Sequence, residues 1–212
     1  MKNGIFILLI SVVLPISSWG QIGNLIGHTT SISNEVNTTF ITEKTDSKAI
    51  ASEISLLAQS ITKNSISEEQ KAKAIFLWIA NNISYDNELH NSKALQKKIY
   101  TSEENVVRHV LNRKRALCGG YAFLYEKLCG EVGLDVAVIH GYSNEFATKV
   151  KRSKPNHTWN AVKLNGKWQL LDITWAISHS RDGGPNLFWF KTPAKDFLKT
   201  HRPENRNWTL TR

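Results

Sequence analysis

Three side chains in separate parts of this 212-residue chain could together carry out nucleophilic chemistry: Cys118, His157 and Asp172. A cysteine thiolate can attack an acyl carbon. An imidazole can hold the thiolate as an ion pair and then protonate the leaving group, and a carboxylate can orient the imidazole. These roles require that the three side chains meet in space. The elements predicted around each residue indicate whether they do.

Cys118 lies where a loop turns into a predicted helix, because Ala122, Tyr125, Leu128 and Cys129 follow it at helical spacing. A helix N-terminus offers free N–H groups and the positive end of the macrodipole. We therefore expect this thiol to ionise more readily than a free cysteine, and its backbone N–H to serve as an oxyanion donor. The two glycines that follow would let a substrate approach the backbone closely. The alternative is an ordinary buried cysteine, since cysteine is among the most buried residue types.

The two cysteines, Cys118 and Cys129, cannot form a disulfide if both lie on this helix. At ~1.5 Å rise per residue they would be roughly 16 Å apart. A disulfide needs Cα atoms within about 7 Å of each other. We expect two free thiols, with Cys129 packed in the core.

A β-hairpin has the clearest signal of any element in the sequence. Residues 158–164 and 167–173 are strand-like runs joined by Asn165 and Gly166. This dipeptide is the strongest short hairpin signal and predicts a two-residue type I′ turn. Such a turn sets the register of the two strands.

The register brings two of the three candidate residues together. It pairs Leu164 with Lys167 and, extended along both strands, His157 with Thr174. Side chains alternate in direction along a strand, so His157 and Asp172 share a face as diagonal neighbours. Such neighbours lie within reach of a side-chain hydrogen bond.

Two other histidines remain alternatives at this point. His140 ends a predicted strand and His179 lies in a predicted loop. Either could take the place of His157 if the register differs from the one predicted.

The first 20 residues predict a cleaved secretory signal peptide. Lys2 supplies a positive n-region, residues 5–16 form an apolar run, and a small-residue site follows, with cleavage expected after Gly20. The run is too short for a comfortable membrane span of ~20 residues. We expect a secreted or periplasmic protein with no stable membrane span after cleavage. The alternative is an uncleaved membrane anchor.

The remaining chain divides into two predicted parts. Residues 21–45 are rich in Ser, Thr, Asn and Gly, which indicates a linker or loosely attached segment. Residues 46–212 predict a single domain whose helical pattern begins near Ser47. The hydrophobic content of 41% is typical of a globular chain with its own core.

The chain is basic, with a formal net charge of +9 that becomes +8 once Lys2 is removed (9 − 1). No stripe of Lys and Arg interleaved with aromatic residues indicates a nucleic-acid partner. Basic runs occur at residues 113–115 and 149–154, and such runs are usually solvated loops. The second run precedes His157 and should border the same cleft. A further hypothesis is that it selects acidic substrates or an anionic cell-wall polymer.

Three blocks of sequence together carry a family resemblance. They are residues 115–122 (RALCGGYA), 156–161 (NHTWNA) and 171–175 (LDITW), and they contain the cysteine, the histidine and the aspartate in that order. They resemble the motifs of the transglutaminase-like domain of the papain-like superfamily. The resemblance also includes residues 74–79, 83–86 and 200–203, so it covers most of the chain from about residue 47 onward.

The resemblance implies an α+β fold in which N-terminal helices and the cysteine-bearing helix pack on an antiparallel β-sheet. It implies a catalytic triad of Cys118, His157 and Asp172 that hydrolyses or transamidates peptide or protein amide bonds. The chain has neither a dense acidic loop for calcium nor zinc-binding cysteine pairs, so we predict no cofactor and no metal. The alternative is a non-catalytic binding or scaffold module on the same fold, since the sequence does not identify a second oxyanion donor.

Overall fold

The computed structural model describes residues 31–144, 154–180 and 183–210, with side chains from residue 47 onward. By its internal contacts the chain divides into residues 1–41 and 42–212, and the second unit contains the fold described below. The predicted signal peptide and the basic run at residues 149–154, apart from Lys154, lie outside the described residues. Within the described part of the chain, no helix is both long enough and apolar enough to cross a membrane.

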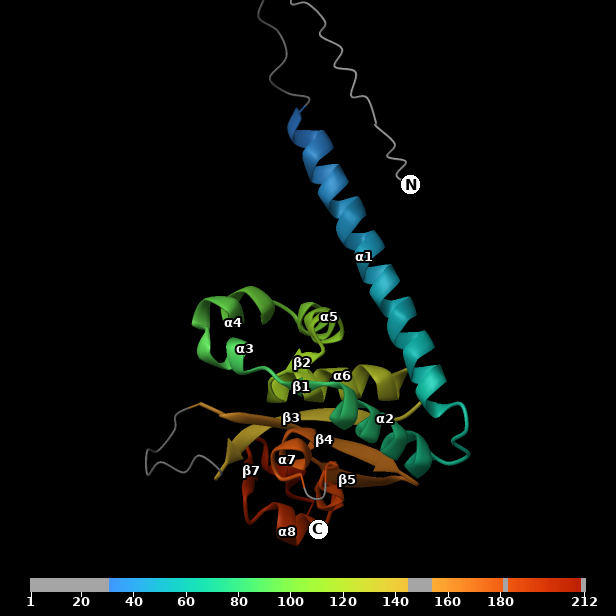
Figure 1. Cartoon of the computed structure of the whole chain (residues 1–212), viewed down its shortest axis with the longest axis vertical. Helices are drawn as coiled ribbons and strands as arrows, with labels where there is room; N and C mark the ends of the chain where they lie inside the picture. The colour runs from blue at the N-terminus through green and yellow to red at the C-terminus, as the bar shows by residue number, and fades with distance from the viewer. Residues whose placement is uncertain (1–30, 145–153, 181–182, 211–212) are drawn as a thin grey trace, which may run out of the picture. The chain divides into compact units, whose positions relative to one another are not determined.

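The described part of the chain contains both helices and strands (Figure 1). The α-helices are α1 (Ser31–Thr62), α2 (Glu68–Asn82), α3 (Asn87–Asn91), α4 (Lys93–Ile99), α5 (Glu103–Arg113), α6 (Cys118–Gly130), α7 (Ile173–Ser178) and α8 (Ala194–Phe197). The strands are β1 (Ser84–Tyr85), β2 (Arg115–Ala116), β3 (Val136–Ser143), β4 (His157–Leu164), β5 (Lys167–Leu171), β6 (Phe190–Thr192) and β7 (His201–Pro203). The 3-10 helices are η1 (Leu187–Trp189) and η2 (Arg206–Thr209).

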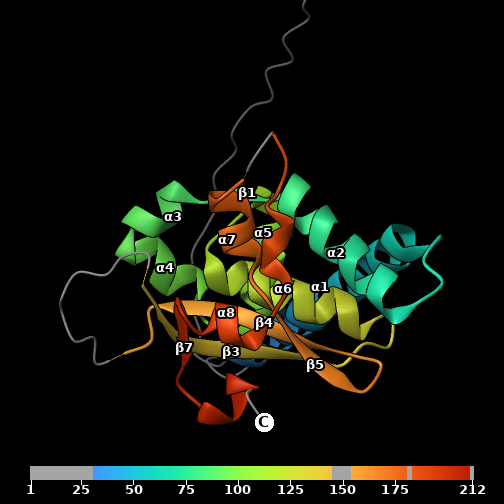
Figure 2. The ribbon, with the colours of Figure 1, turned by 90° about the horizontal axis from the view of Figure 1, so that it is seen from below.

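The main sheet has five strands in the order β6-β5-β4-β3-β7, and each neighbouring pair is antiparallel. Helix α6 packs against β3 and β4, and α2 and α5 pack against α6 (Figures 1 and 2). A separate two-stranded parallel sheet joins β1 to β2 just before α6. This arrangement confirms the predicted α+β class, with the cysteine-bearing helix packed on an antiparallel sheet.

Helix α6 forms the centre of the core because nearly its whole surface is apolar. Tyr121, Leu124, Tyr125 and Leu128 are each at most 1% exposed. The Tyr125 hydroxyl donates a hydrogen bond to the carbonyl of Ala72 in α2, and the Tyr121 hydroxyl donates one to the carbonyl of Ile83, the C-cap of α2, so both buried hydroxyls have partners. The cysteine at the start of α6 is therefore held by a helix that cannot shift without disturbing the core.

The predicted hairpin turn and its register are confirmed. Asn165 and Gly166 both have positive φ, as a type I′ turn requires, and Leu164 pairs with Lys167. The ladder ends with Asn160 opposite Leu171, however. The expected strand over residues 167–173 is therefore two residues too long, and the pairing of His157 with Thr174 is wrong. The chain turns into α7 instead.

Helix α1 begins at Ser31, well before the predicted helix start near Ser47. Residues 31–45, part of the predicted linker, are thus helical. Ile54 and Ala58, near the C-terminal end of α1, belong to the core of the second unit. Whether residues 21–45 are loosely attached stays a prediction.

Candidate active site

Cys118 is the first residue of α6 and is partly buried. The residue before it, Leu117, is the N-cap and contributes no side-chain hydrogen bond to the helix. The first-turn N–H groups of a helix lack carbonyl partners within the helix itself. Cys118 therefore lies in the electrostatic setting predicted for it, beside donors that favour negative charge.

The two glycines after Cys118 have a packing role that differs from the predicted one. A Cβ at Gly120 would lie 2.9 Å from Val110 Cγ2 and 3.0 Å from the Cβ of Ala116. A Cβ at Gly119 would lie 3.2 Å from Cε1 of Tyr100. Both glycines are buried, so they let α6 approach its neighbours rather than opening the backbone to a substrate.

Tyr100 lies against the first turn of α6 and was not among the sequence candidates. A Cβ at Gly119 would also lie 3.5 Å from the Tyr100 hydroxyl oxygen. No pattern in the sequence marks Tyr100, because it lies in the connection between α4 and α5.

His157 is the first residue of β4 and is 7% exposed. It lies opposite Gly141 of β3, and the neighbouring Asn156 clamps this end of the pair. The Asn156 side chain accepts from Ser143 N at 3.0 Å and donates to Ser143 O at 3.3 Å. The start of β4 is therefore fixed by both backbone and side-chain bonds.

Asp172 follows β5 and is the N-cap of α7, where its Oδ1 accepts a hydrogen bond from Trp175 N at 2.9 Å. Its Oδ2 lies 2.5 Å from Nε2 of His157. The predicted contact between His157 and Asp172 is therefore present, although Asp172 reaches it as a helix cap and not as a strand residue.

The imidazole of His157 lies between two partners. Its Nε2 faces Asp172, and Cys118 interacts electrostatically with the same ring, for which Nδ1 is left. The structure thus brings together the three side chains named from the sequence.

Burial and neighbouring charges shift the pKa values of His157 and Asp172 in opposite directions. Burial alone would lower the pKa of His157, but Asp172 and then Cys118 outweigh it and raise that pKa to about 10. Burial alone would raise the pKa of Asp172, but the charge and hydrogen bond of His157 outweigh it, with a further hydrogen bond from His201. The Asp172 pKa lies well below its usual range. Both shifts favour the imidazolium form of His157 and the carboxylate form of Asp172.

His201, in β7, is a second histidine on the same carboxylate, with its Nε2 3.0 Å from Asp172 Oδ2. Sequence reasoning did not select it as a site residue. Its one signal was its place in the run at residues 200–203, within the family resemblance. The alternatives His140 and His179 lie elsewhere: His140 shares a hydrogen bond with Thr158, and the ring of His179 packs on Trp175.

His157, Asp172 and His201 are residue types that can hold a metal, and their ligand atoms lie within 4.8 Å of one another. A tetrahedral ion at ~2.0–2.1 Å from each ligand keeps the ligand atoms about 3.3 Å apart. The separation of 2.5 Å between His157 and Asp172 is too short for two ligands of one ion. The cluster is a hydrogen-bonded network.

The thiol and the imidazole open onto a cleft of about 910 Å³. One wall comes from the region of α3 and α4, one from α6 and one from α7. The described residues that line it are Tyr85, Asn87, His90, Lys93, Gln96, Leu117, Cys118, Tyr121, Pro155, Asn156, His157, Thr174, Ile177 and Ser178. No acidic side chain is among them, whereas Lys93 and His90 are basic.

Comparison with known families identifies the family of the chain. The model of the transglutaminase-like superfamily matches residues 55–173, more than half of the chain. The chain therefore belongs to the transglutaminase-like superfamily, as its motifs predicted.

Two curated relatives are the kyphoscoliosis peptidases of Mus musculus and Homo sapiens. The mouse protein is 30% identical over 181 residues, which cover 79% of this chain and 26% of the relative. The human protein is 30% identical over 163 residues, 73% of this chain and 24% of the relative. The chain thus spans about a quarter of the length of these relatives. A crystal structure of a TGase is 25% identical, with a TM-score of 0.44, over 60% of this chain and 32% of that one.

Proposed function

We propose that this protein is an exported cysteine acyl-transfer enzyme that acts on peptide or protein amide bonds. The observation that carries the proposal is the position of His157, which is hydrogen-bonded to Asp172 and lines the same cleft as Cys118, whose interaction also raises the pKa of His157. A thiol, an imidazole and a carboxylate in this order form a nucleophilic triad.

In this proposal the Cys118 thiolate attacks the carbonyl carbon of an amide. The resulting oxyanion is stabilised by the backbone N–H of Cys118 at the start of α6. His157 then gives its proton to the leaving amine as the C–N bond breaks, which leaves a thioester on Cys118. Water or a second amine attacks the thioester, and His157 takes up the proton that this nucleophile loses. Water gives hydrolysis and an amine gives transamidation.

A protein or peptide substrate is supported by the cleft and by the relatives. The cleft is large enough for an extended segment of several residues, and it is open to the surface beside Cys118 and His157. The matched relatives in mouse and human are named as peptidases. The basic lining at His90 and Lys93 supports the hypothesis of an acidic substrate or an anionic cell-wall polymer. Export is supported by the pattern of the first 20 residues.

The proposal is tested by comparing Cys118→Ala with Cys129→Ala. Cys129 is a matched control because it lies on the same helix and is fully buried, with a pKa raised by that burial. The probes are unfolded casein as the amide donor and a fluorescent primary amine as the acceptor. We expect casein cleavage or amine incorporation by the wild type and by Cys129→Ala, and none by Cys118→Ala.

Activity that survives in Cys118→Ala would overturn the assignment of the nucleophile. A wild type that is inactive and whose Cys118 reacts with iodoacetamide no faster than a free cysteine would overturn the enzyme proposal. That result would favour the non-catalytic module.

A further inference from the structure

The Asp172 carboxylate has more partners than a triad requires. Oδ2 lies 2.5 Å from His157 Nε2 and 3.0 Å from His201 Nε2, and Oδ1 accepts from Trp175 N at 2.9 Å. The side chain of Asp172 is 1% exposed and that of His201 is fully buried. Two histidines from different strands thus converge on one buried oxygen.

The second histidine addresses a problem created by the proposed chemistry. When His157 gives up its Nδ1 proton, it keeps the Nε2–H that faces Asp172, but the buried carboxylate loses its cationic partner. A buried carboxylate that loses a neighbouring positive charge is more readily protonated. A donor that takes no part in the proton transfer keeps the carboxylate ionised and in place throughout the reaction.

His201 is held as a donor by packing. Its ring stacks on Phe197 with centroids 4.1 Å apart, lies 4.5 Å from the ring of Trp175, and meets Trp159 edge-on at 5.1 Å. A ring enclosed in this way cannot turn Nε2 away from Asp172 without displacing aromatic side chains. The packing therefore fixes which nitrogen faces the carboxylate.

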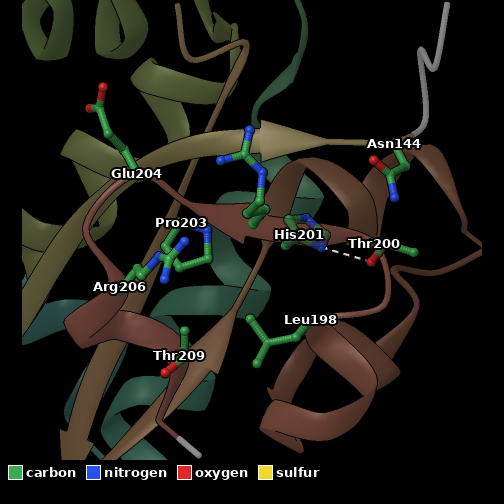
Figure 3. A pocket seen from close by; sticks show the side chains of 9 residues that line it. Asn144, Leu198, Thr200, His201, Pro203, Glu204, Arg206 and Thr209 are labelled. Atoms are coloured by element: carbon green, nitrogen blue, oxygen red, sulfur yellow. Dashed lines mark hydrogen bonds between the residues drawn. The ribbon is translucent and has the colours of Figure 1, made fainter. Parts of the chain in front are cut away.

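Thr200 holds the other nitrogen of the ring. Its Oγ1 lies 2.8 Å from His201 Nδ1. Figure 3 shows this contact among the side chains that line a surface pocket, whose volume is about 560 Å³. The same hydroxyl lies 3.2 Å from the Phe197 carbonyl. It can donate to Nδ1, or it can accept from Nδ1–H while it donates to Phe197. In both arrangements His201 keeps a proton on Nε2, because an ionised carboxylate can only accept.

We propose that His201 is a positioning residue that acts through Asp172: it holds the carboxylate in the orientation and charge state that His157 needs. This inference rests on the proposed function. The titratable groups that face Asp172 are His157 of β4 and His201 of β7, and Cys118 of α6 faces His157 from its other side. The competing interpretation is that His201 only fills space among the aromatic rings.

The test uses His201→Phe, which keeps the ring packing and removes the donor, and His201→Gln, which keeps an N–H donor. The readout is the rate of iodoacetamide alkylation of Cys118 across pH. Removing a donor from a charged group costs on the order of tenfold, so we expect His201→Phe to react roughly tenfold more slowly at neutral pH. Its profile should shift toward that of a free cysteine, and His201→Gln should recover most of the loss.

A double-mutant cycle separates positioning from packing. In an Asp172→Asn background, His201→Phe should have no further effect on the alkylation rate, because the residue through which it acts is already changed. An equal loss in that background would show a packing role and overturn the inference. Thr200→Val retains His201 and should slow the alkylation of Cys118 in the same direction but by less. This variant replaces His201→Phe in the test if His201→Phe does not fold.

The outcomes for this inference and for the proposed function are distinct. A wild-type Cys118 that reacts readily at neutral pH, with unchanged profiles in His201→Phe and Thr200→Val, overturns the role of His201 and leaves the proposed function standing. A wild-type thiol without that reactivity overturns both.

Discussion

At the scale of single residues, Asp172 connects the local fold to the chemistry. Its Oδ1 caps α7 through Trp175 N, while Oδ2 receives both histidines. The same side chain thus ends the hairpin, begins a helix and orients His157. Substitutions of Asp172 can separate these roles, because an amide can still cap a helix but cannot carry the charge.

We predict that Asp172→Asn lowers the free energy of unfolding by about 3 kcal/mol, since a buried pair then loses its charged partner. Asp172→Ala should cost about 1 kcal/mol more because the N-cap acceptor is also lost. Urea denaturation of the two variants and the wild type measures both differences. Equal stability of the two variants would contradict the capping role.

The effect of Asp172→Asn on stability should depend on pH. The folded-state pKa of His157, about 10, exceeds its unfolded value, so its contribution is fully present below about pH 6.5 and is lost as the pH rises through 10. Folding lowers the pKa of Asp172, so its contribution is present above about pH 4 and is lost as the pH falls. The difference between variant and wild type is expected to be largest between about pH 4 and pH 6.5. A difference that increases above pH 8 would contradict the pairing.

At the scale of elements, the position of Cys118 depends on how closely α6 approaches α5 and β2. Gly120 permits that approach, since a Cβ there would lie 2.9 Å from Val110 and 3.0 Å from Ala116. Gly130, at the other end of α6, has no atom within 4 Å of its hypothetical Cβ. The two glycines therefore make a matched pair.

We predict that Gly120→Ala destabilises the protein by about 1–3 kcal/mol, because the added methyl group overpacks the contact. Gly130→Ala should be neutral or stabilising by up to about 1 kcal/mol, because alanine favours a helix. Thermal or urea unfolding of both variants tests the contrast. If Gly120→Ala were as stable as Gly130→Ala, the packing role of Gly120 would be wrong.

Elements built from local signals were predictable from the sequence. The helix after Cys118 followed from apolar spacing, and the hairpin register followed from Asn165 and Gly166. The conversion of residues 173–178 into α7 was not predicted. A run that contains Ile, Thr and Trp has strand propensity, whereas its helical conformation depends on the Asp172 cap and on packing against α2 and α6.

At the scale of the whole molecule, the site joins residues that are far apart along the chain. Cys118 comes from α6, His157 from β4 and Asp172 from the boundary of β5 and α7. His201 arrives because β7 pairs with β3 on the side away from β4. A pairing between segments this distant has no local sequence signal, which is why His157 and Asp172 could be linked from the sequence while His201 could not.

The pH dependence of Cys118 alkylation, measured in the wild type and in His157→Ala, tests the central claim most directly. An imidazolium beside the thiol stabilises the thiolate, so the wild-type thiol should react with iodoacetamide faster than a free cysteine at the same pH. In His157→Ala the rate should fall toward that of a free cysteine. A wild-type profile that resembles a free cysteine and does not change in His157→Ala would contradict a working Cys118–His157 pair.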